Sequence, residues 1–554
     1  MTSREGGDWS PTGGSVDASG KTSPQGTCMS ADDSLEAILE TVARSMTDPG
    51  VEVVIGTPED CTVRRLVDDS RMVEPGDLFV ARGGSVTEGI RHIGQAVERG
   101  AVAVLASSKA FEDAEIRVGL GPAVGLAAED PLGAGVAIAR IRCDHPAGKL
   151  RTVGITGTNG KTTIATIVRQ LVDRTIGPCG LVGTLELHDG HRSRPARVTT
   201  PGRLELVEIL AGMVETGCGS LAIEVSSHAL DQGRVADLEF QVAIFTNLSG
   251  DHLDYHGTMA SYAAAKASMF TGLSEEALAV VNLDDPAAAT MLESCGARRV
   301  GITMRRIPEP EASGLVDRFV SVELVAVDDL GMDLRWTGLQ STPMDGRVPL
   351  VGTHNAFNLT AALLAAIELG AHPAAAIEAL QSIEAPRGRL EPVHRPDDSI
   401  RVYVDYAHTD EAIRTVLTAV RPSVRADSAL VAVIGAGGDR DRTKRPRMMR
   451  AALDVADRVI VTSDNPRTED PAAIVAEVLA GAGPDERGRT RSEVDRATAI
   501  EEAILEAGAG DHVVIAGKGH ETYQIIGSKR RPFDDRTVAS AALARRRDRD
   551  GGDG

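Results

Sequence analysis

The stretch from Thr152 to Thr163, with the sequence TVGITGTNGKTT, constrains the fold of this chain more than any other. It begins with a short apolar run typical of a buried strand, and apolar residues with helical spacing resume at Ile164. Between these elements, Gly157 and Gly160 can adopt backbone angles that are closed to other residues. A strand, a tight glycine loop and a helix start direct several backbone N–H groups to one point, at the positive end of the helix dipole. The stretch therefore predicts a phosphate site.

Two side chains in this loop indicate which phosphate compound binds. Lys161 supplies a mobile positive charge for the β- and γ-phosphates, and the Thr162 hydroxyl is a ligand suited to Mg²⁺. The strict P-loop spacing is not met, because Gly154 stands one residue too early relative to Gly160. We predict that ATP, with Mg²⁺ as cofactor, binds Gly157, Thr158, Asn159, Gly160, Lys161, Thr162 and Thr163.

Composition narrows the possible classes of protein. The 554 residues allow about three domains, and 42% hydrophobic with 25% charged residues is ordinary for a soluble globular chain. A net charge of −21 and only 3% aromatic residues argue against binding to nucleic acid. The six cysteines are scattered, and neither a signal core nor a membrane-length apolar run is present. We expect a cytoplasmic monomer that binds neither nucleic acid nor membrane.

Apolar runs, turns and helical stretches alternate along the chain and predict an α/β protein of three domains. Residues 32–148 form a small α/β domain, residues 149–386 a central ATP-binding domain with a mostly parallel sheet, and residues 387–540 a doubly wound domain. Residues 1–31 and 541–554 have the composition of disordered tails. The predicted strands are residues 77–81, 101–105, 153–155, 221–225, 242–246, 402–404, 430–434, 458–461 and 513–515.

The central domain offers three further candidate residues. Glu224 ends a predicted strand, where a carboxylate can reach a Mg²⁺ that Thr162 also holds. His252 follows another strand and is a candidate metal or phosphate contact, although a lone loop histidine is more often structural. Lys266 lies in an Ala-rich helix, and the local sequence alone indicates a surface lysine.

In the last domain, four predicted strands each run into a polar loop. The carboxyl ends of parallel strands meet at one edge of a sheet, where ligands bind. Cations and carboxylates gathered there suit a zwitterionic or di-acidic ligand, because arginine can bind a carboxylate through two hydrogen bonds. Joining two substrates at the expense of ATP is one use of this layout among others. The charged residues of these loops include Arg440, Lys444, Arg445, Asp464, Arg467, Lys518 and Glu521.

Several of these motifs closely resemble those of the Mur ligases, over about residues 60–530. The motifs are Thr156–Thr163, Thr199–Pro201, Glu224–His228, Asn247–Asp254, Ala263–Lys266, Asp405–Thr409 and Gly437–Arg440. Asp464–Arg467 and Gly517–Glu521 are similar to those of the members that add meso-diaminopimelate to UDP-N-acetylmuramoyl-L-alanyl-D-glutamate for peptidoglycan. The resemblance implies a UDP-binding first domain, a P-loop-type central ATPase domain and a Rossmann-like last domain.

The resemblance also implies a mechanism and a role for individual residues. ATP phosphorylates the D-glutamyl carboxylate, and the amine of diaminopimelate attacks the acyl phosphate. The implied catalytic residues are Lys161, Glu224, His252 and Lys266, and His408 joins the ATP-binding residues. Magnesium is implied to lie among Thr162, Glu224, His252 and Lys266, the last as a carbamate. The UDP-muramoyl dipeptide is implied to bind Ser70, Thr199, Thr200, Ser226, Gln232 and Arg234. Diaminopimelate is implied to bind Arg440, Asp464, Asn465, Pro466, Arg467, Gly517 and Glu521.

Two kinds of alternative stay open. Within the same fold, the chain could add lysine or another amino acid, or act as a folylpolyglutamate-type synthetase. Arg467 argues against lysine, because its guanidinium suits a distal carboxylate that lysine lacks. From a different class, the chain could be a nucleotide-dependent binding or regulatory module without ligase activity. Gly250, where many family members have arginine, is a departure from the family pattern.

Overall fold

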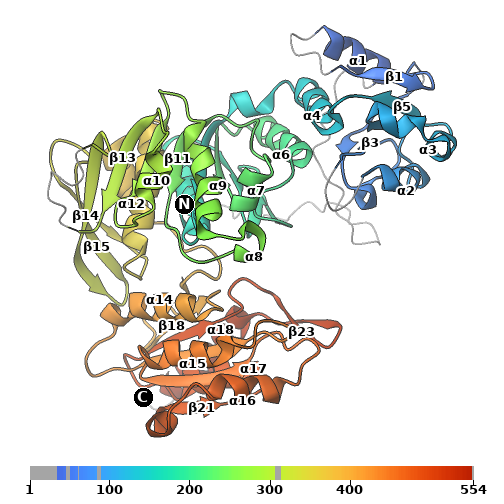
Figure 1. Ribbon diagram of the computed structural model, residues 1–554. Coiled ribbons are helices and arrows are strands. Elements are labelled where there is room, and N and C mark those ends of the chain that lie inside the picture. Colours follow the sequence, from blue (N-terminus) through green and yellow to red (C-terminus); the bar gives the residue numbers. More distant parts are fainter. Residues whose placement is uncertain (1–33, 45–49, 60, 84–88, 306–313, 552–554) are drawn as a thin grey trace, which may run out of the picture. The chain divides into compact units, whose positions relative to one another are not determined.

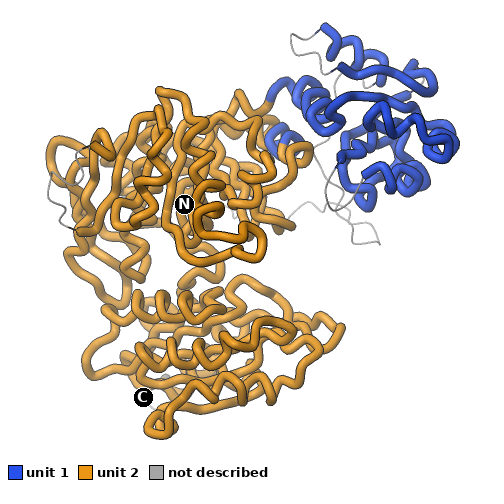
Figure 2. Tube along the Cα trace, viewed as in Figure 1, with its two compact units in different colours: residues 1–145, 207–212 blue, residues 146–206, 213–554 orange. Residues whose placement is uncertain are grey.

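The computed structural model describes residues 34–44, 50–59, 61–83, 89–305 and 314–551. The predicted tail at residues 1–31 lies outside the described residues. Two compact units make up the chain, one of residues 1–145 with 207–212 and the other of residues 146–206 with 213–554 (Figure 2). The three-domain division stays a prediction.

The first unit contains a five-stranded sheet in the order β1-β5-β4-β3-β2. Strands β2 to β5 are parallel, and β1 runs antiparallel at the edge. Phe79, Val104 and Leu120 lie in the apolar core of this unit. Its strands are β1 (Glu52–Ile55), β2 (Leu66–Val67), β3 (Leu78–Val80), β4 (Ala103–Ala106) and β5 (Val124–Ala127). Its helices are α1 (Leu35–Ala43), α2 (Ile93–Glu98), α3 (Ala114–Gly119) and α4 (Pro131–Arg142).

The second unit begins with an eleven-stranded sheet in the order β16-β15-β14-β13-β12-β11-β6-β10-β7-β8-β9. The seven neighbouring strands β14, β13, β12, β11, β6, β10 and β7 pair in parallel. At the two edges, β15 and β16 and likewise β8 and β9 add antiparallel hairpins. The strands are β6 (Arg151–Thr156), β7 (Cys179–Val182), β8 (Glu186–His188), β9 (Ser193–Pro195), β10 (Ser220–Glu224), β11 (Phe240–Phe245), β12 (Leu278–Asn282), β13 (Arg298–Thr303), β14 (Arg318–Asp328), β15 (Gly331–Thr337) and β16 (Met344–Val348). The predicted mostly parallel sheet is confirmed.

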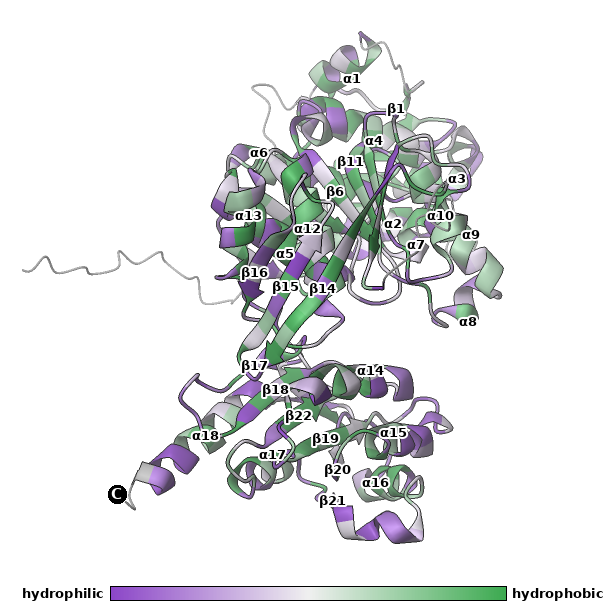
Figure 3. Cartoon of the chain, turned by 90° about the vertical axis from the view of Figure 1, so that its left-hand side faces the viewer, coloured by the Kyte–Doolittle hydropathy of each residue, from purple (hydrophilic) through white to green (hydrophobic). Residues whose placement is uncertain are grey.

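One face of this sheet is covered by α5 (Lys161–Thr175), α12 (Asn355–Glu368) and α13 (Pro373–Leu380). Figure 1 labels α12, and Figure 3 labels all three helices. Alternate strand residues such as Val153 and Ile155 pack against Ile164 and Val168 of α5 in one buried cluster. This packing fixes the direction in which α5 leaves β6, so it also positions the glycine loop between them. The other helices are α6 (Arg203–Glu215), α7 (Ser227–Asp231), α8 (Leu253–His256), α9 (Met259–Thr271) and α10 (Ala288–Leu292).

The last sheet has the order β17-β18-β22-β19-β20-β21, and all of its strands except β17 are parallel. Successive residues of the inner strands point alternately into two apolar cores, one beneath α14–α16 and the other beneath α17–α18. Helices therefore cover both faces of this sheet, as predicted. Figure 3 shows the apolar strands between these polar-faced helices. The strands are β17 (Glu391–Pro392), β18 (Arg401–Asp405), β19 (Leu430–Ala436), β20 (Arg458–Ser463), β21 (Thr490–Ser492) and β22 (His512–Ala516). The helices are α14 (Asp410–Val420), α15 (Lys444–Leu453), α16 (Pro471–Leu479), α17 (Arg496–Leu505) and α18 (Asp535–Gly551).

The predicted disordered tail at residues 541–554 is wrong for its described part, because α18 continues to Gly551. Ala542 and Leu543 are buried against α17, and Arg546 donates a hydrogen bond to the Ile504 carbonyl (2.9 Å). The exposed charged residues Arg545, Asp548 and Arg549 lie on the outer face of this amphipathic helix end. Residues 552–554 lie outside the described residues.

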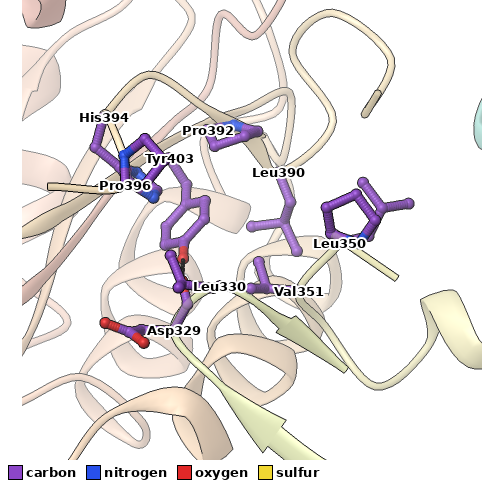
Figure 4. Close-up of a pocket in the computed structure, with 10 residues that line it drawn as sticks. Asp329, Leu330, Leu350, Val351, Leu390, Pro392, His394, Pro396 and Tyr403 are labelled. Atoms are coloured by element: carbon purple, nitrogen blue, oxygen red, sulfur yellow. Dashed lines mark hydrogen bonds between the residues drawn. The ribbon is translucent and has the colours of Figure 1, made fainter. Parts of the chain in front are cut away.

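The tip of the β14–β15 hairpin meets the last sheet at a cavity of about 170 Å³ (Figure 4). Asp329 of the tip forms an ion pair with Arg401 (2.7 Å), and its carbonyl faces the Tyr403 hydroxyl (3.5 Å). The walls are mostly apolar and include Leu330, Leu350 and Leu390, and none of the predicted site residues lines them. None of the described helices has both the length and the apolar composition that a membrane crossing requires.

Candidate active site

The glycine loop joins the end of β6 at Thr156 to the start of α5 at Lys161, as the sequence predicts. Gly157 has a φ of 142°, and a Cβ at this position would lie 1.8 Å from the Thr246 Oγ1. Gly160 has a φ of 90°. Both positions therefore require glycine, the first because β11 continues into a segment that presses against the loop.

The loop is held to that segment by hydrogen bonds from both sides. Thr158 N donates to the Asn247 carbonyl (2.9 Å), and Asn159 N donates to the Asn247 side-chain oxygen (3.0 Å). Thr246 Oγ1 in turn donates to the Asn159 carbonyl (2.6 Å). Such anchoring fixes the backbone of the loop before any ligand arrives, which favours binding because little ordering remains to be done.

Lys161 folds back over this loop. Its Nζ donates to the carbonyls of Gly157 (2.8 Å) and Thr158 (2.9 Å). Burial lowers the pKa of Lys161, the neighbouring Arg389 lowers it further, and Glu224 acts in the opposite direction. Arg389 comes from the segment that leads into the last sheet, and sequence reasoning did not assign it to this site. The proximity of this arginine to Lys161 could be recognised only from the fold.

Glu224, at the end of β10, is almost fully buried (1% exposed) and accepts three hydrogen bonds. The donors are Thr162 Oγ1 (2.8 Å), Thr184 N (2.8 Å) and Thr184 Oγ1 (3.0 Å). Thr162 and Glu224, the two residues predicted to share a Mg²⁺, are thus in direct contact, and their role at the metal stays a prediction. Thr184 is a partner of Glu224 that sequence reasoning missed.

This carboxylate and its hydroxyl neighbours are the hard oxygen ligands that Mg²⁺ prefers, so the residues fit the predicted cofactor. Among the described residues, no group of three or more His, Cys, Asp or Glu side chains is arranged to hold a metal. Mg²⁺ commonly binds through one or two carboxylates together with substrate phosphates, so a single carboxylate beside a phosphate loop suits it.

Lys266 is buried in the structure (1% exposed), so the surface lysine that the local sequence indicates is wrong. It lies on the inner side of α9, with its Nζ 4.4 Å from the centre of the Tyr262 ring. Burial, reinforced by the charge of Lys161, lowers the pKa of Lys266 to about 6. The Tyr262 hydroxyl lies 3.2 Å from Thr158 Oγ1, which connects this pair to the glycine loop.

His252 stands in a left-handed backbone conformation (φ 54°) at the start of α8. Its ring lies 4.9 Å from that of His228, 6.4 Å from that of Tyr262, and 3.5 Å from the Asp251 carboxylate. Burial lowers the pKa of His228, and the charges of His252 and its neighbours add to this effect. The described contacts of His252 therefore place it in a cluster of rings that reaches Lys266 through Tyr262, and its predicted role at the metal stays a prediction.

Five of the residues predicted to bind the UDP-muramoyl dipeptide lie close together beside Glu224. Thr200 Oγ1 donates to the Glu224 carbonyl (2.8 Å) and accepts from Ser226 N (3.1 Å). Arg234 donates to the Thr200 carbonyl (2.9 Å) and to the Gln232 side chain (3.0 Å). The fifth residue, Thr199, has its hydroxyl 3.1 Å from that of Thr184.

The sixth residue, Ser70, lies in the first unit. It is buried there, and its hydroxyl donates a hydrogen bond to the Gln95 side chain (2.8 Å).

A second polar cluster lies beyond β20 and β22, where the sequence predicts an amino-acid site. Asn465 donates to Glu521 Oε2 (2.8 Å), which joins the Asp464–Arg467 loop to the Gly517–Glu521 loop. Gly517 has a φ of 121°, and a Cβ there would lie 3.3 Å from Asp464 Oδ2. These two loops are therefore in direct contact, as their place at one sheet edge requires.

Arg467 has a positive φ (51°), and a hairpin formed by β23 (Tyr523–Ile526) and β24 (Lys529–Pro532) stabilises this conformation. Arg467 N donates to the Ile525 carbonyl (3.0 Å), and Gly527 N donates to the Arg467 carbonyl (2.6 Å). The Arg467 guanidinium donates to the Gly438 carbonyl (2.8 Å). Gly438 also packs against the Pro466 carbonyl so closely that a Cβ at position 438 would overlap it. Sequence reasoning did not identify the backbone of this hairpin as a support for Arg467.

Other charged residues of these loops have different surroundings. Arg440 and His408 are exposed; Arg440 donates a long hydrogen bond to the Asp439 carbonyl (3.4 Å). Lys444 donates to the His408 carbonyl (3.2 Å). Arg445 is fully buried and forms ion pairs with Glu469 (2.8 Å) and Glu477 (2.7 Å), so it braces α15 and is not available to a ligand.

Comparison with known proteins places this geometry in context. The chain matches the models of the Mur ligase middle domain over residues 155–366 and of the Mur ligase glutamate ligase domain over residues 388–519. The UDP-N-acetylmuramoyl-L-alanyl-D-glutamate–2,6-diaminopimelate ligase of Gloeobacter violaceus is 42% identical over 494 residues, which are 88% of this chain and 96% of that protein. The ligase of the same name from Synechococcus elongatus is 41% identical over 495 residues, with 88% and 95% covered.

Solved structures agree with this comparison. A structure of a UDP-N-acetylmuramoyl-L-alanyl-D-glutamate–2,6-diaminopimelate ligase matches with a TM-score of 0.62 and 33% identity, and covers 89% of this chain and 97% of its own. A MurF ligase from Thermotoga maritima in complex with ADP has a TM-score of 0.55 at 19% identity, with 88% of this chain and 97% of its own covered. The second match shows a common fold.

Proposed function

The chain belongs to the Mur ligase family, and on that premise we propose that it joins meso-diaminopimelate to UDP-N-acetylmuramoyl-L-alanyl-D-glutamate with ATP as co-substrate. The product is a peptidoglycan precursor. The observation that carries this proposal is the identity of about 40% to ligases so named, over nearly their whole length. The contact between the Asp464–Arg467 loop and Glu521 supports it, because the proposed amino-acid pocket is already assembled.

The reaction has two steps in which this chain's residues have distinct tasks. The γ-phosphoryl group of ATP passes to the γ-carboxylate of the D-glutamyl residue, ADP leaves, and an acyl phosphate forms. An amine of diaminopimelate then attacks the acyl carbon; the C–N bond forms, the C–O bond to phosphate breaks, and the amine loses a proton. The loop N–H groups and Lys161 bind the phosphates and stabilise the charge of the transferring group.

Magnesium would be held by Thr162 and Glu224, and when bound it neutralises phosphate charge. Thr184 fixes the Glu224 carboxylate through two hydrogen bonds, so that its orientation does not depend on the ligand. Thr200 and Arg234 bind each other beside Glu224, which suits a role in placing the dipeptide carboxylate next to the γ-phosphate.

Lys266 has the properties that carbamate formation needs. With a pKa of about 6, its side chain is a neutral amine at neutral pH, and the lone pair of that amine can attack the carbon of CO₂. The nitrogen then loses a proton and a carbamate anion forms. The neutral amine beside Lys161 thereby becomes an anion, and an anion attracts the positive charge of Lys161.

Phosphate release from ATP in the presence of the UDP-muramoyl dipeptide and single amino acids tests this function. We expect release with meso-diaminopimelate and a product whose mass has increased by one diaminopimelate residue. Equal release with lysine would favour a ligase of different specificity. Nucleotide binding without release, with any amino acid, would favour the regulatory module.

A further inference from the structure

Lys518 follows β22 after the single residue Gly517 and is fully buried (0% exposed) between the two loops of the proposed amino-acid pocket. Its Nζ lies 3.0 Å from Glu521 Oε2, 3.2 Å from Asn465 Oδ1 and 3.5 Å from Asp464 Oδ1. Lysine is almost never fully buried unless its charge is paired, and these three acceptors match its three N–H donors. All three acceptors belong to the residues predicted to bind diaminopimelate.

The bonds from Lys518 determine how Asn465 presents its amide. Asn465 Oδ1 accepts from Lys518 and from Ile525 N (2.9 Å), while its Nδ2 donates to Glu521 Oε2 (2.8 Å). Because both ends of the amide are engaged, a flip would break three hydrogen bonds and place Nδ2 against an ammonium. The orientation of Asn465 is therefore set by Lys518 together with the β23–β24 hairpin.

The same bonds orient Glu521. Among the described residues, the side-chain hydrogen bonds of Glu521 end on Oε2, where Lys518 and Asn465 both donate. This arrangement leaves Oε1 to accept from a ligand ammonium. The Lys518 ammonium also offsets part of the negative charge that Asp464 and Glu521 place close together.

We propose that Lys518 is a positioning residue for the amino-acid substrate: it fixes Asn465 and Glu521 from behind and sets the affinity for diaminopimelate without contacting it. This inference rests on the proposed function and deepens it. A purely structural lysine would instead stabilise the last domain and leave the relative affinities of the three substrates unchanged.

The test compares Lys518→Met with Lys529→Met, which removes an ammonium from the exposed strand β24 of the same region. Each KM is measured with the other two substrates saturating. For Lys518→Met we expect the KM for meso-diaminopimelate to rise about 10- to 100-fold, because Asn465 and Glu521 lose their common donor. The KM values for ATP and the UDP-muramoyl dipeptide should stay within about twofold of wild type. Lys529→Met should resemble wild type.

An unchanged KM for diaminopimelate, or an equal rise in all three KM values, would overturn the inference. If circular dichroism shows that Lys518→Met does not fold, Lys518→Gln replaces it with the same expectation, since glutamine keeps a donor but not the charge. Failure of both variants to fold would also overturn it, because Lys518 would then be a core residue. Loss of the proposed function itself is recognised separately, by wild-type enzyme that releases no phosphate with diaminopimelate.

Discussion

The glycine loop after β6 and the paired loops after β20 and β22 are both polar sites at the carboxyl edge of a parallel sheet, but they are built differently. The first is made from backbone: Gly157 and Gly160 shape it, and Asn247 holds it by hydrogen bonds to main-chain groups. The second is made from side chains of three segments, with Lys518, Asn465 and Glu521 bound to one another. A backbone site suits phosphate, which every chain can bind through N–H groups, whereas selection of one amino acid requires particular side chains.

The largest expected effect concerns the side-chain site and its selectivity. Lysine lacks the distal carboxylate of meso-diaminopimelate and would leave the Arg467 guanidinium unpaired, so we expect wild-type enzyme to prefer diaminopimelate by about 10⁴-fold in kcat/KM. Arg467→Ala should lose most of this preference by losing diaminopimelate activity. Arg467→Lys keeps the charge but not the two-point geometry and should recover only part of it. Equal rates with lysine and diaminopimelate in wild type would contradict this pocket.

The next largest expected effect concerns Lys161, the charged side chain of the glycine loop. Lys161→Ala should lower kcat about 10³-fold, because the ammonium stabilises charge on the transferring phosphoryl group. Lys529→Ala is the matched control, since Lys529 is exposed on the β23–β24 hairpin, and it should keep wild-type turnover. Phosphate release by the Lys161→Ala enzyme at a near-normal rate, with the fold verified by thermal melting, would exclude the assigned ATP site.

A smaller effect depends on pH and on Lys266. Only the neutral amine reacts with CO₂, so carbamate occupancy should rise as the pH increases through about 6 and fall below it. The ¹³C signal of the carbamate, followed by NMR in labelled bicarbonate between pH 5 and pH 8, measures this. Lys266→Ala should lose about 10²-fold in activity and regain part of it with added short-chain carboxylates. A fully active enzyme without a carbamate signal would remove this modification from the mechanism.

The smallest expected effect concerns the backbone shape of the glycine loop, and it is measured as protein stability instead of activity. Gly157→Ala introduces a Cβ into contact with Thr246 at a positive φ, so both strain and overpacking should lower the unfolding free energy, by about 3 kcal/mol. Gly177 has a similar φ (151°), and a Cβ there would meet no atom within 4 Å, so Gly177→Ala should show the strain alone, about 1 kcal/mol. Equal shifts in melting temperature would mean that the contact with Thr246 contributes nothing.

Much of the fold could be predicted because the strands carry their signal locally. Val402–Val404 and Val513–Ile515 are short β-branched runs, and both lie inside strands of the last sheet. The helical end of the chain at residues 541–551 was missed, because its buried face consists of only a few residues among many charged ones. Periodicity in such a short segment is too weak to distinguish a helix from a solvated tail.

The glycine loop was evident in the sequence because its requirements are local: positive φ angles, a helix start and a lysine within a few residues. For Lys266 the local sequence indicated a surface residue, and only the family resemblance indicated a role. Its burial, its contact with Tyr262 and the effect of Lys161 on its pKa depend on the tertiary structure, and Lys161 is 105 positions away in the numbering. Thr184, Arg389 and the β23–β24 hairpin likewise reach the sites from distant segments. The sequence by itself determined which residues have the chemistry to act. The tertiary structure alone decided their burial and their long-range contacts, and these set the pKa values and the orientations of their side chains.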